Sequence, residues 1–185
     1  SATGSQSFAA GRNALATNNN AFVWGGYNIV SVTTTSTNNN SFTVRAPGGV
    51  RFITTAATNN LGIGPGGTNG VAVAPGGTSW ETLSDSNAKT KVTAIKPREI
   101  LQKLSQLPVS QWEYKHDPNR RYIGPMSQDF HAAFGLGYDD KSISTLDSDG
   151  VMYAAIQGLV EELRLRDKTI EELKAKLDAV EQRLE

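Results

Sequence analysis

The 185-residue sequence contains no cysteine, which excludes disulfides and thiolate metal sites. Its two histidines, His116 and His131, have no partner at the spacing of metal ligands. No apolar run approaches the roughly 20 residues that a membrane helix needs. We therefore expect no metal, no cofactor and no insertion into a membrane. Because the chain begins at Ser1 rather than at Met, we also expect it to be a piece of a longer protein, so the lack of a signal peptide indicates little about its location.

Acidic residues are absent from residues 1–80, where the only charges are Arg12, Arg45 and Arg51. The rest of the chain holds all 18 acidic residues and is net acidic. A glycan-cleaving enzyme usually needs two carboxylates beside the scissile bond, and a nucleic-acid binder needs a basic stripe. The first activity is therefore disfavoured in the acid-free segment, and nucleic-acid binding is disfavoured in the remainder. Two chemically different modules are joined near Trp80 and Glu81.

Repeated short stretches predict that the first module consists of stacked β units. The stretch "SFAAG" aligns with "AFVWG" at an offset of 14, which places Phe8 over Phe22 and Gly11 over Gly25. The stretch "NNNAFVW" at 18–24 returns as "NNNSFTV". Such self-similarity is typical of units that cannot bury their apolar faces alone. The Asn triplets and three Pro-Gly-Gly stretches supply turns between them.

Strand-like runs lie between these turns, namely "FVWGGYNIVSV", "FTVRAPGGVRFIT" and "VAVA". We predict that residues 1–81 form an intertwined β-roll or β-prism fibre segment whose apolar faces pack against copies of itself. A flexible glycine-rich linker is the alternative, but it would not need the phased Phe, Val and Trp positions. The three tryptophans are most simply packing residues, although Trp24 on an exposed rim could stack on a sugar.

The second module has the mixed pattern of a small α+β domain. The run "VTAI" at 92–95 predicts a strand, and Pro97 fits the first turn of a helix that Pro108 stops. The apolar residues of that helix follow helical spacing: Ile100, Leu101, Leu104 and Leu107. The run "VSQWEYK" at 109–115 predicts another strand.

Turn signals divide the remainder of this module. We expect "DPNR" at 117–120 to form a turn and residues 121–137 to form a strand that runs into a short helix. Either Gly135 or Gly137 is expected to close that helix. The stretch "LDSDG" at 146–150 predicts a further turn.

A heptad repeat from Val151 to the end predicts one long helix. Its seam has a single Arg at a d position and consists of Ile156, Leu159, Leu163, Arg166, Ile170, Leu173, Leu177, Val180 and Leu184. A helix of about 35 residues spans roughly 50 Å, which is too long for this small module to cover. Partner helices are therefore implied, while the mixture of Ile, Leu and Val does not choose between two and three strands.

Several motifs occur together in a recognisable order. They are "SDSNAK" (84–89), "ILQKLSQLPVSQWEYK" (100–115), "YIGPMSQDF" (122–130) and "DSDGVMYAAIQGLVEEL" (147–163), followed by the heptads. Over residues 82–185 this order resembles the intramolecular chaperone domain of phage tail spikes, tail fibres and endosialidases. The earlier stretch "SFAAGRNALATNNNAFVWGG" is similar to head repeats of trimeric autotransporter adhesins.

The first resemblance implies an α+β homotrimer with three parts. Residues 1–81 are the intertwined β fibre segment, residues 82–150 are the α+β core of the chaperone, and residues 151–185 are its long C-terminal coiled-coil helix. In the resembled family this domain trimerises, helps a β-rich fibre to fold, and then cuts itself off through a Ser-Lys dyad.

Carried over residue by residue, the resemblance implies that Ser84 is the nucleophile and Lys89 its base. The scissile peptide then joins Leu83 to Ser84. Asp85 matches the family's acid and is a supporting residue without an assigned role. Residues 86–88 replace the basic residues that the family usually has there, which bears on the rate of cutting.

The chemistry of such a pair sets two conditions. A neutral lysine can take the proton of a serine hydroxyl, yet only about one free lysine in 2,500 is neutral at pH 7, so burial must lower its pKa. Positions five apart do not share a face of an α-helix. Ser84 and Lys89 must therefore meet across a bend or across a subunit boundary. Either arrangement would form on folding, and cutting would then report correct assembly.

Two functions stay open at this point. The first is a self-cleaving serine endopeptidase that acts once, between Leu83 and Ser84, to release a chaperone from a folded fibre. The second is a permanent, non-cleaving trimer clamp at the end of an adhesin fibre, in which Ser84 and Asp85 are ordinary turn or cap residues. In both, the partners are other copies of the chain and a cell-surface glycan or receptor. The expected location is extracellular, on a cell surface or a virion fibre.

Overall fold

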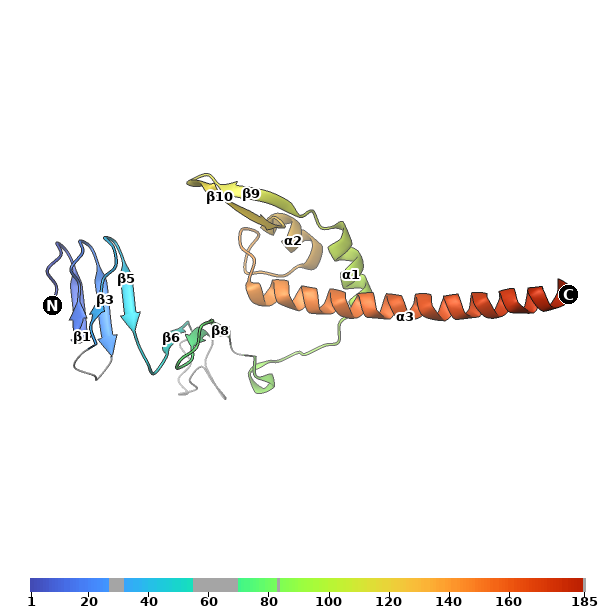
Figure 1. Cartoon of the computed structure of the whole chain (residues 1–185), viewed down its shortest axis with the longest axis horizontal. Coiled ribbons are helices and arrows are strands. Elements are labelled where there is room, and N and C mark those ends of the chain that lie inside the picture. The colour runs from blue at the N-terminus through green and yellow to red at the C-terminus, as the bar shows by residue number, and fades with distance from the viewer. Residues whose placement is uncertain (27–31, 55–69, 83, 185) are drawn as a thin grey trace. The chain divides into compact units, whose positions relative to one another are not determined.

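The computed structural model describes residues 1–26, 32–54, 70–82 and 84–184. The chain divides into two compact units, Ser1–Val92 and Thr93–Glu185 (Figure 1). The fold is α+β: strands make up the first unit, and the second contains a hairpin, two short helices and a long C-terminal helix. Within the described ranges, no helix is long and apolar enough to span a bilayer.

A parallel three-stranded sheet forms the start of the first unit. Strands β1 (Phe8–Arg12), β3 (Phe22–Gly26) and β5 (Phe42–Arg45) lie in that order (Figure 1). Phe8 pairs with Phe22 and Gly11 with Gly25, and Phe22 pairs in turn with Phe42. The register predicted from both repeats is thus confirmed. Whether this stack is part of an intertwined β-roll or β-prism stays a prediction.

Small side chains fill the interior of this stack. Its core consists of Ala14, Ala16, Ala21 and Val23, and strands β2 (Ala14–Leu15) and β4 (Thr34–Thr35) pair in parallel beside it. Such residues let neighbouring turns approach closely, but they bury little apolar area. The large side chains lie outside: Phe8 is 53% and Phe42 66% exposed, and both rings stack on Phe22 with centroids 5.0 and 4.9 Å away.

The turns of the stack repeat as the strands do. Gln6, Asn20 and Asn40 occupy equivalent positions and have φ angles of 54°, 54° and 58°. Asparagine tolerates this left-handed conformation better than most residues. The amide of Asn20 donates to Asn40 Oδ1 at 2.9 Å, which links successive turns. The Asn triplets therefore act both as turn formers and as a hydrogen-bonded ladder.

An antiparallel sheet follows in the same unit. It consists of β6 (Val50–Ile53), β7 (Gly70–Val73) and β8 (Glu81–Thr82), with β7 in the middle. The Pro-Gly-Gly stretches that begin at Pro47 and Pro75 lie in turns at the ends of β6 and β7, as predicted. The third stretch, at 65, and the part of the first strand-like run at 27–31 lie outside the described residues.

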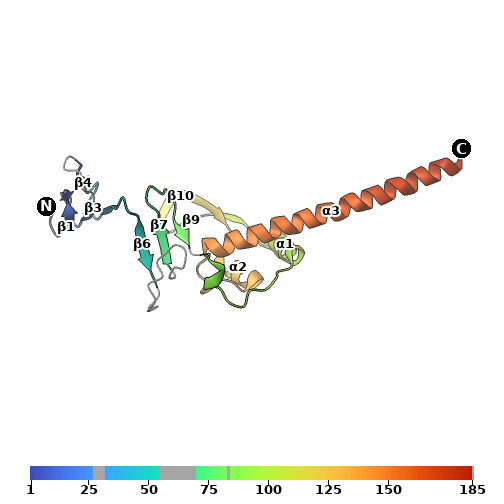
Figure 2. The ribbon, with the colours of Figure 1, turned by 90° about the horizontal axis from the view of Figure 1, so that it is seen from below.

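The second unit is organised around the N-terminal part of its long helix. Helices α1 (Pro97–Gln106) and α3 (Thr145–Leu184) lie side by side (Figures 1 and 2). Pro97 opens α1 as predicted. Gly158 is buried in α3 where a Cβ would collide with the carbonyl of Pro97, so the two helices cross at van der Waals distance. Arg98 Nη2 donates to Glu162 Oε2 at 2.9 Å across the same contact.

A β-hairpin and a short helix complete this unit. Strands β9 (Ser110–Tyr114) and β10 (Asp117–Gly124) pair antiparallel, and α2 (Ser127–Phe134) ends at Gly135 in the left-handed conformation. Of Gly135 and Gly137, the two residues predicted to end this helix, Gly135 is the one that does so. Trp112 stacks on Tyr122 across the strands with centroids 4.7 Å apart. Aromatic pairs of this kind stabilise two-stranded hairpins, which are marginal alone.

Three local predictions are wrong. Residues 92–95 form no strand, and Val92 and Ile95 are 79% and 55% exposed because no neighbouring strand pairs with them. The hairpin turns at residues 115–116, so "DPNR" lies in β10, where an irregular register between Asp117 and Arg121 accommodates the proline. The turn predicted at 146–150 is the first part of α3.

The helical outcome at 146–150 has a physical explanation. Asp147 lies in the first turn of α3, where a negative charge favours the helix dipole. This stabilisation opposes the helix-destabilising effect of Gly150, which costs about 1 kcal/mol relative to alanine.

Most of α3 carries an exposed apolar seam. The buried residues of this helix lie near its start, at Val151, Ala154, Ala155 and Gly158. The apolar seam residues are each at least 48% exposed, and they are Ile156, Leu159, Leu163, Ile170, Leu173, Leu177, Val180 and Leu184. A seam of this length and exposure is what a coiled coil buries on association, so oligomerisation through α3 stays our prediction.

Candidate functional site

The predicted serine and lysine lie within hydrogen-bond distance of each other. Lys89 Nζ donates to Ser84 Oγ at 2.8 Å. A single 3-10 turn, η1 (Ser86–Ala88), separates them, and Lys89 itself returns to an extended conformation. Of the two arrangements left open by the sequence, the bend within one chain is therefore sufficient to bring the pair together. Leu83, the predicted carbonyl side of the cut, lies outside the described residues.

Asp85 holds the turn that separates the pair. Its Oδ1 accepts from the backbone N of Asn87 at 2.9 Å and from Asn87 Nδ2 at 3.0 Å. Its main-chain oxygen accepts from Ala88 N at 3.1 Å, and Lys89 N donates to the oxygen of Ser86 at 3.2 Å. Asp85 is thus the N-cap of η1. A turn or cap role for Asp85 was one of the interpretations that the sequence left open, while its partner Asn87 was not predicted; an Asp side chain that accepts from the backbone two residues on forms an Asx-turn.

Solvent reaches the candidate site in the single chain. Ser84 and Lys89 are exposed, and Asp85 is half-buried. The burial that the lysine chemistry requires is therefore not supplied by the described part of one chain. Water competes for the hydrogen bonds of an exposed pair, so proximity alone makes Ser84 a weak nucleophile.

The two histidines take part in packing contacts. The ring of His116 stacks on Tyr114 with centroids 5.1 Å apart. His131 Nδ1 lies 2.8 Å from the carbonyl of Leu136, just beyond the end of α2. Across the described ranges, no group of three His, Asp or Glu side chains is placed to hold a metal ion.

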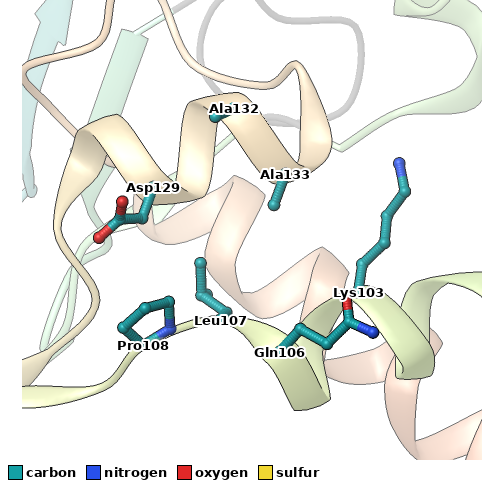
Figure 3. Close-up of a pocket in the computed structure, with 7 residues that line it drawn as sticks. All are labelled: Lys103, Gln106, Leu107, Pro108, Asp129, Ala132 and Ala133. Carbon is teal, nitrogen blue, oxygen red and sulfur yellow. The ribbon is translucent and has the colours of Figure 1, made fainter.

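A shallow pocket of about 490 Å³ lies between the end of α1 and α2. Figure 3 shows the residues that line it: Lys103, Gln106, Leu107, Pro108, Asp129, Ala132 and Ala133. Lys103 and Asp129 lie at opposite sides of this group (Figure 3). Because no serine, threonine or cysteine lines the pocket, it offers no hydroxyl or thiol for serine-type chemistry, and the Ser84–Lys89 pair is our candidate for that chemistry.

Comparison with known families identifies the segment that begins at this pair. Residues 84–135 match a peptidase family described as "Chaperone of endosialidase", and this segment of the chain is an intramolecular chaperone domain of that family. The matched range starts at Ser84 and extends through α1 and the hairpin to the end of α2. Searches of curated proteins and of solved structures found no match. The likeness of residues 7–26 to adhesin head repeats stays a prediction.

Proposed function

We propose that the chain is the C-terminal part of a homotrimeric fibre, in which residues 84–185 trimerise, help the β-rich segment to fold and then cut themselves off between Leu83 and Ser84. The observation that carries this proposal is the 2.8 Å hydrogen bond between Ser84 Oγ and Lys89 Nζ. The match of residues 84–135 to a peptidase family of chaperones supports it. The chaperone acts on a tail or surface fibre, so the protein is on a virion or outside the cell.

The proposed cut proceeds in two balanced steps. With Lys89 as a neutral amine, its Nζ takes the proton of Ser84 while Oγ bonds to the carbonyl carbon of Leu83. The bond from that carbon to the Ser84 nitrogen breaks, the nitrogen receives the proton, and Leu83 is left as an ester on Ser84 Oγ. Water then hydrolyses the ester to the Leu83 carboxylate and the Ser84 hydroxyl and releases one proton, while the α-amine of Ser84 freed in the first step becomes the new N-terminus.

Assembly would govern this reaction through desolvation. The described contacts that bring Ser84 and Lys89 together all lie within residues 84–89, so the distance does not depend on a second chain. Both side chains are exposed, however, so water competes for the hydrogen bond between them. Packing of this segment against other copies would exclude water and favour the neutral amine. Cutting would then follow trimer formation.

The seam of α3 supports the trimerisation step. A coiled coil formed through it raises the local concentration of the β segments and aligns their ends. Parallel pairings between strands that are not adjacent in sequence, such as Phe8 with Phe22 and Phe22 with Phe42, nucleate slowly and slip in register when unguided. Once the fibre has folded, removal of the chaperone domain leaves no route by which the strands can exchange register, and the fibre is kinetically stable. A cell-surface glycan that stacks on Trp24, which is 38% exposed, is the proposed ligand of the fibre.

The alternative is a permanent trimer clamp that never cuts. The observation that favours it is the exposure of both Ser84 and Lys89 in the single chain. In that case Ser84 and Asp85 serve as turn residues, and the chaperone domain remains attached to the fibre as its end.

The denatured mass of the purified full chain separates the two functions. Self-cleavage predicts two pieces that meet between Leu83 and Ser84, and a single uncut chain in Ser84→Ala and in Lys89→Ala. Ser86→Ala and Lys91→Ala are matched controls, since each removes the same side-chain type two positions further on, and both should cut like wild type. An uncut wild type favours the clamp, and normal cutting by Lys89→Ala contradicts its role as the base.

A further inference from the structure

We propose that Asp85 is a positioning residue, which sets the distance between Lys89 and Ser84 by holding the turn between them. This inference rests on the proposed self-cleavage and assigns a role to a residue that the sequence left without one. Asp85 does not touch the reacting atoms in this account. It acts through Asn87 and the backbone of η1.

The geometry shows why the pair depends on a turn. In an extended chain, residues five apart are separated by about 16 Å along the strand. A 3-10 turn rises only about 2 Å per residue and completes a full turn in three residues, which shortens the distance between the residues on either side of it. The flanks of η1 are extended, with ψ near 131° at Asp85 and 148° at Lys89. The three residues between them therefore supply the whole change of direction.

Asp85 is the main anchor of that change. Three of the described hydrogen bonds of the turn end on it: two from Asn87 to the carboxylate and one from Ala88 N to the main-chain oxygen. A three-residue 3-10 turn has poor intrinsic hydrogen-bond geometry and is easily lost without a cap. The carboxylate is therefore expected to decide how often the turn is formed.

The hydrogen bonds of the Asp85 carboxylate favour a role in holding the turn over a direct electrostatic effect on Lys89. Among the described residues, no ion pair joins Asp85 to Lys89, and the bonds of Oδ1 go to Asn87. A carboxylate bonded to the ammonium would also hold the proton on the base, which opposes general-base catalysis. Any residue that caps the turn should therefore replace Asp85, whether or not it is charged.

Cap-competent substitutions test this role in the full chain. Asp85→Ala should cut about 10-fold more slowly, the size expected when an N-cap is lost. Asp85→Ser and Asp85→Asn should restore cutting to within about 3-fold of wild type, because both residues cap helices well. Across a pH series the plateau rate should fall in Asp85→Ala while the pH of half-maximal rate stays unchanged. Asp140→Ala removes a carboxylate from the second unit and should cut normally.

The contrary results are distinct. Asp85→Ala cutting at the wild-type rate overturns the proposal, and so does Asp85→Asn being as slow as Asp85→Ala, which would point to a role for the charge. A shift in the pH of half-maximal rate in Asp85→Ala would also indicate a role for the charge and overturn the proposal.

A second measurement follows the turn without cutting. In the uncut Ser84→Ala chain, the backbone amide of Asn87 should be protected from hydrogen exchange, and adding Asp85→Ala should remove that protection. Loss of protection with no effect on cutting would overturn the positioning role alone. An uncut wild type, by contrast, would defeat self-cleavage and with it any catalytic positioning by Asp85.

Discussion

Substitution of Gly158 by alanine should destabilise the second unit, although alanine is the better helix former. A Cβ at Gly158 would overlap the carbonyl group of Pro97, which is backbone and has no side-chain rotation to relieve the contact. Overpacking of this kind costs about 1–3 kcal/mol, and we expect the upper end because α1 must shift as a whole. The intrinsic preference for alanine returns about 1 kcal/mol. The net loss is then about 2 kcal/mol, or roughly 10 °C in Tm for a unit of this size.

Gly150 provides a matched control in the same helix. Nothing lies within 4 Å of a Cβ built there, so Gly150→Ala should raise Tm by about 5 °C from helix preference alone. Thermal unfolding followed by circular dichroism at equal chain concentration compares the two variants. If Gly158→Ala proves as stable as Gly150→Ala, the close crossing of α1 and α3 is wrong.

Three further substitutions test other parts of the structure. Gln6→Asn should raise the free energy of unfolding of the first unit by about 1 kcal/mol, seen as a higher urea midpoint, because asparagine suits the left-handed conformation that Asn20 and Asn40 already share. Gln6→Ala should give no such gain. Arg166→Leu should raise the Tm of the oligomer, since burying a leucine in an apolar seam contributes about 1.5–3 kcal/mol; a lower Tm would show that this position faces away from a partner helix. Donation from Lys141 N and the Ser142 hydroxyl lowers the pKa of Asp139 below 3.8, so its stabilising contribution is present above that pH and lost as the pH falls through the folded value. Asp139→Asn should therefore lose less stability between neutral pH and about pH 3 than wild type, and an identical loss would contradict this.

Internal repeats made the register of the first unit predictable. In a stacked structure, equivalent residues lie over one another, so aligning Phe8 with Phe22 also gives the pairing of the strands that contain them. The offset changes from 14 to 20 residues between the first and second repeat, yet Phe22 still pairs with Phe42. The strand register therefore follows the repeated residues even though the spacing between repeats changes.

The wrong predictions all concern short segments whose structure depends on distant partners. Val92 and Ile95 have strand-forming side chains, but a strand needs a neighbour, and none of the described strands pairs with them. Pro118 is a turn signal that a bulged edge strand accommodates equally well. Glycine and aspartate near residue 150 indicate a turn locally, while packing of the following turns against α1 extends the helix over them.

For the candidate site, the resemblance supplied the residue types and the structure supplied their geometry. Ser84 and Lys89 were predicted as a pair, and a bend was one of two ways for them to meet. The role of Asp85 was not accessible, because an acid beside a serine is equally compatible with charge, cap and turn functions. Only the direction of its hydrogen bonds toward Asn87 distinguishes them.

The central claim is that Ser84 attacks the peptide bond that precedes it, and the N-terminus of the purified chaperone piece tests it most directly. After expression of the full chain, intact mass and N-terminal sequencing of the trimer should give a fragment that begins at Ser84 and contains α3, beside a fragment that ends at Leu83. A chain that remains whole, or a fragment that begins at another residue, would contradict the proposed function.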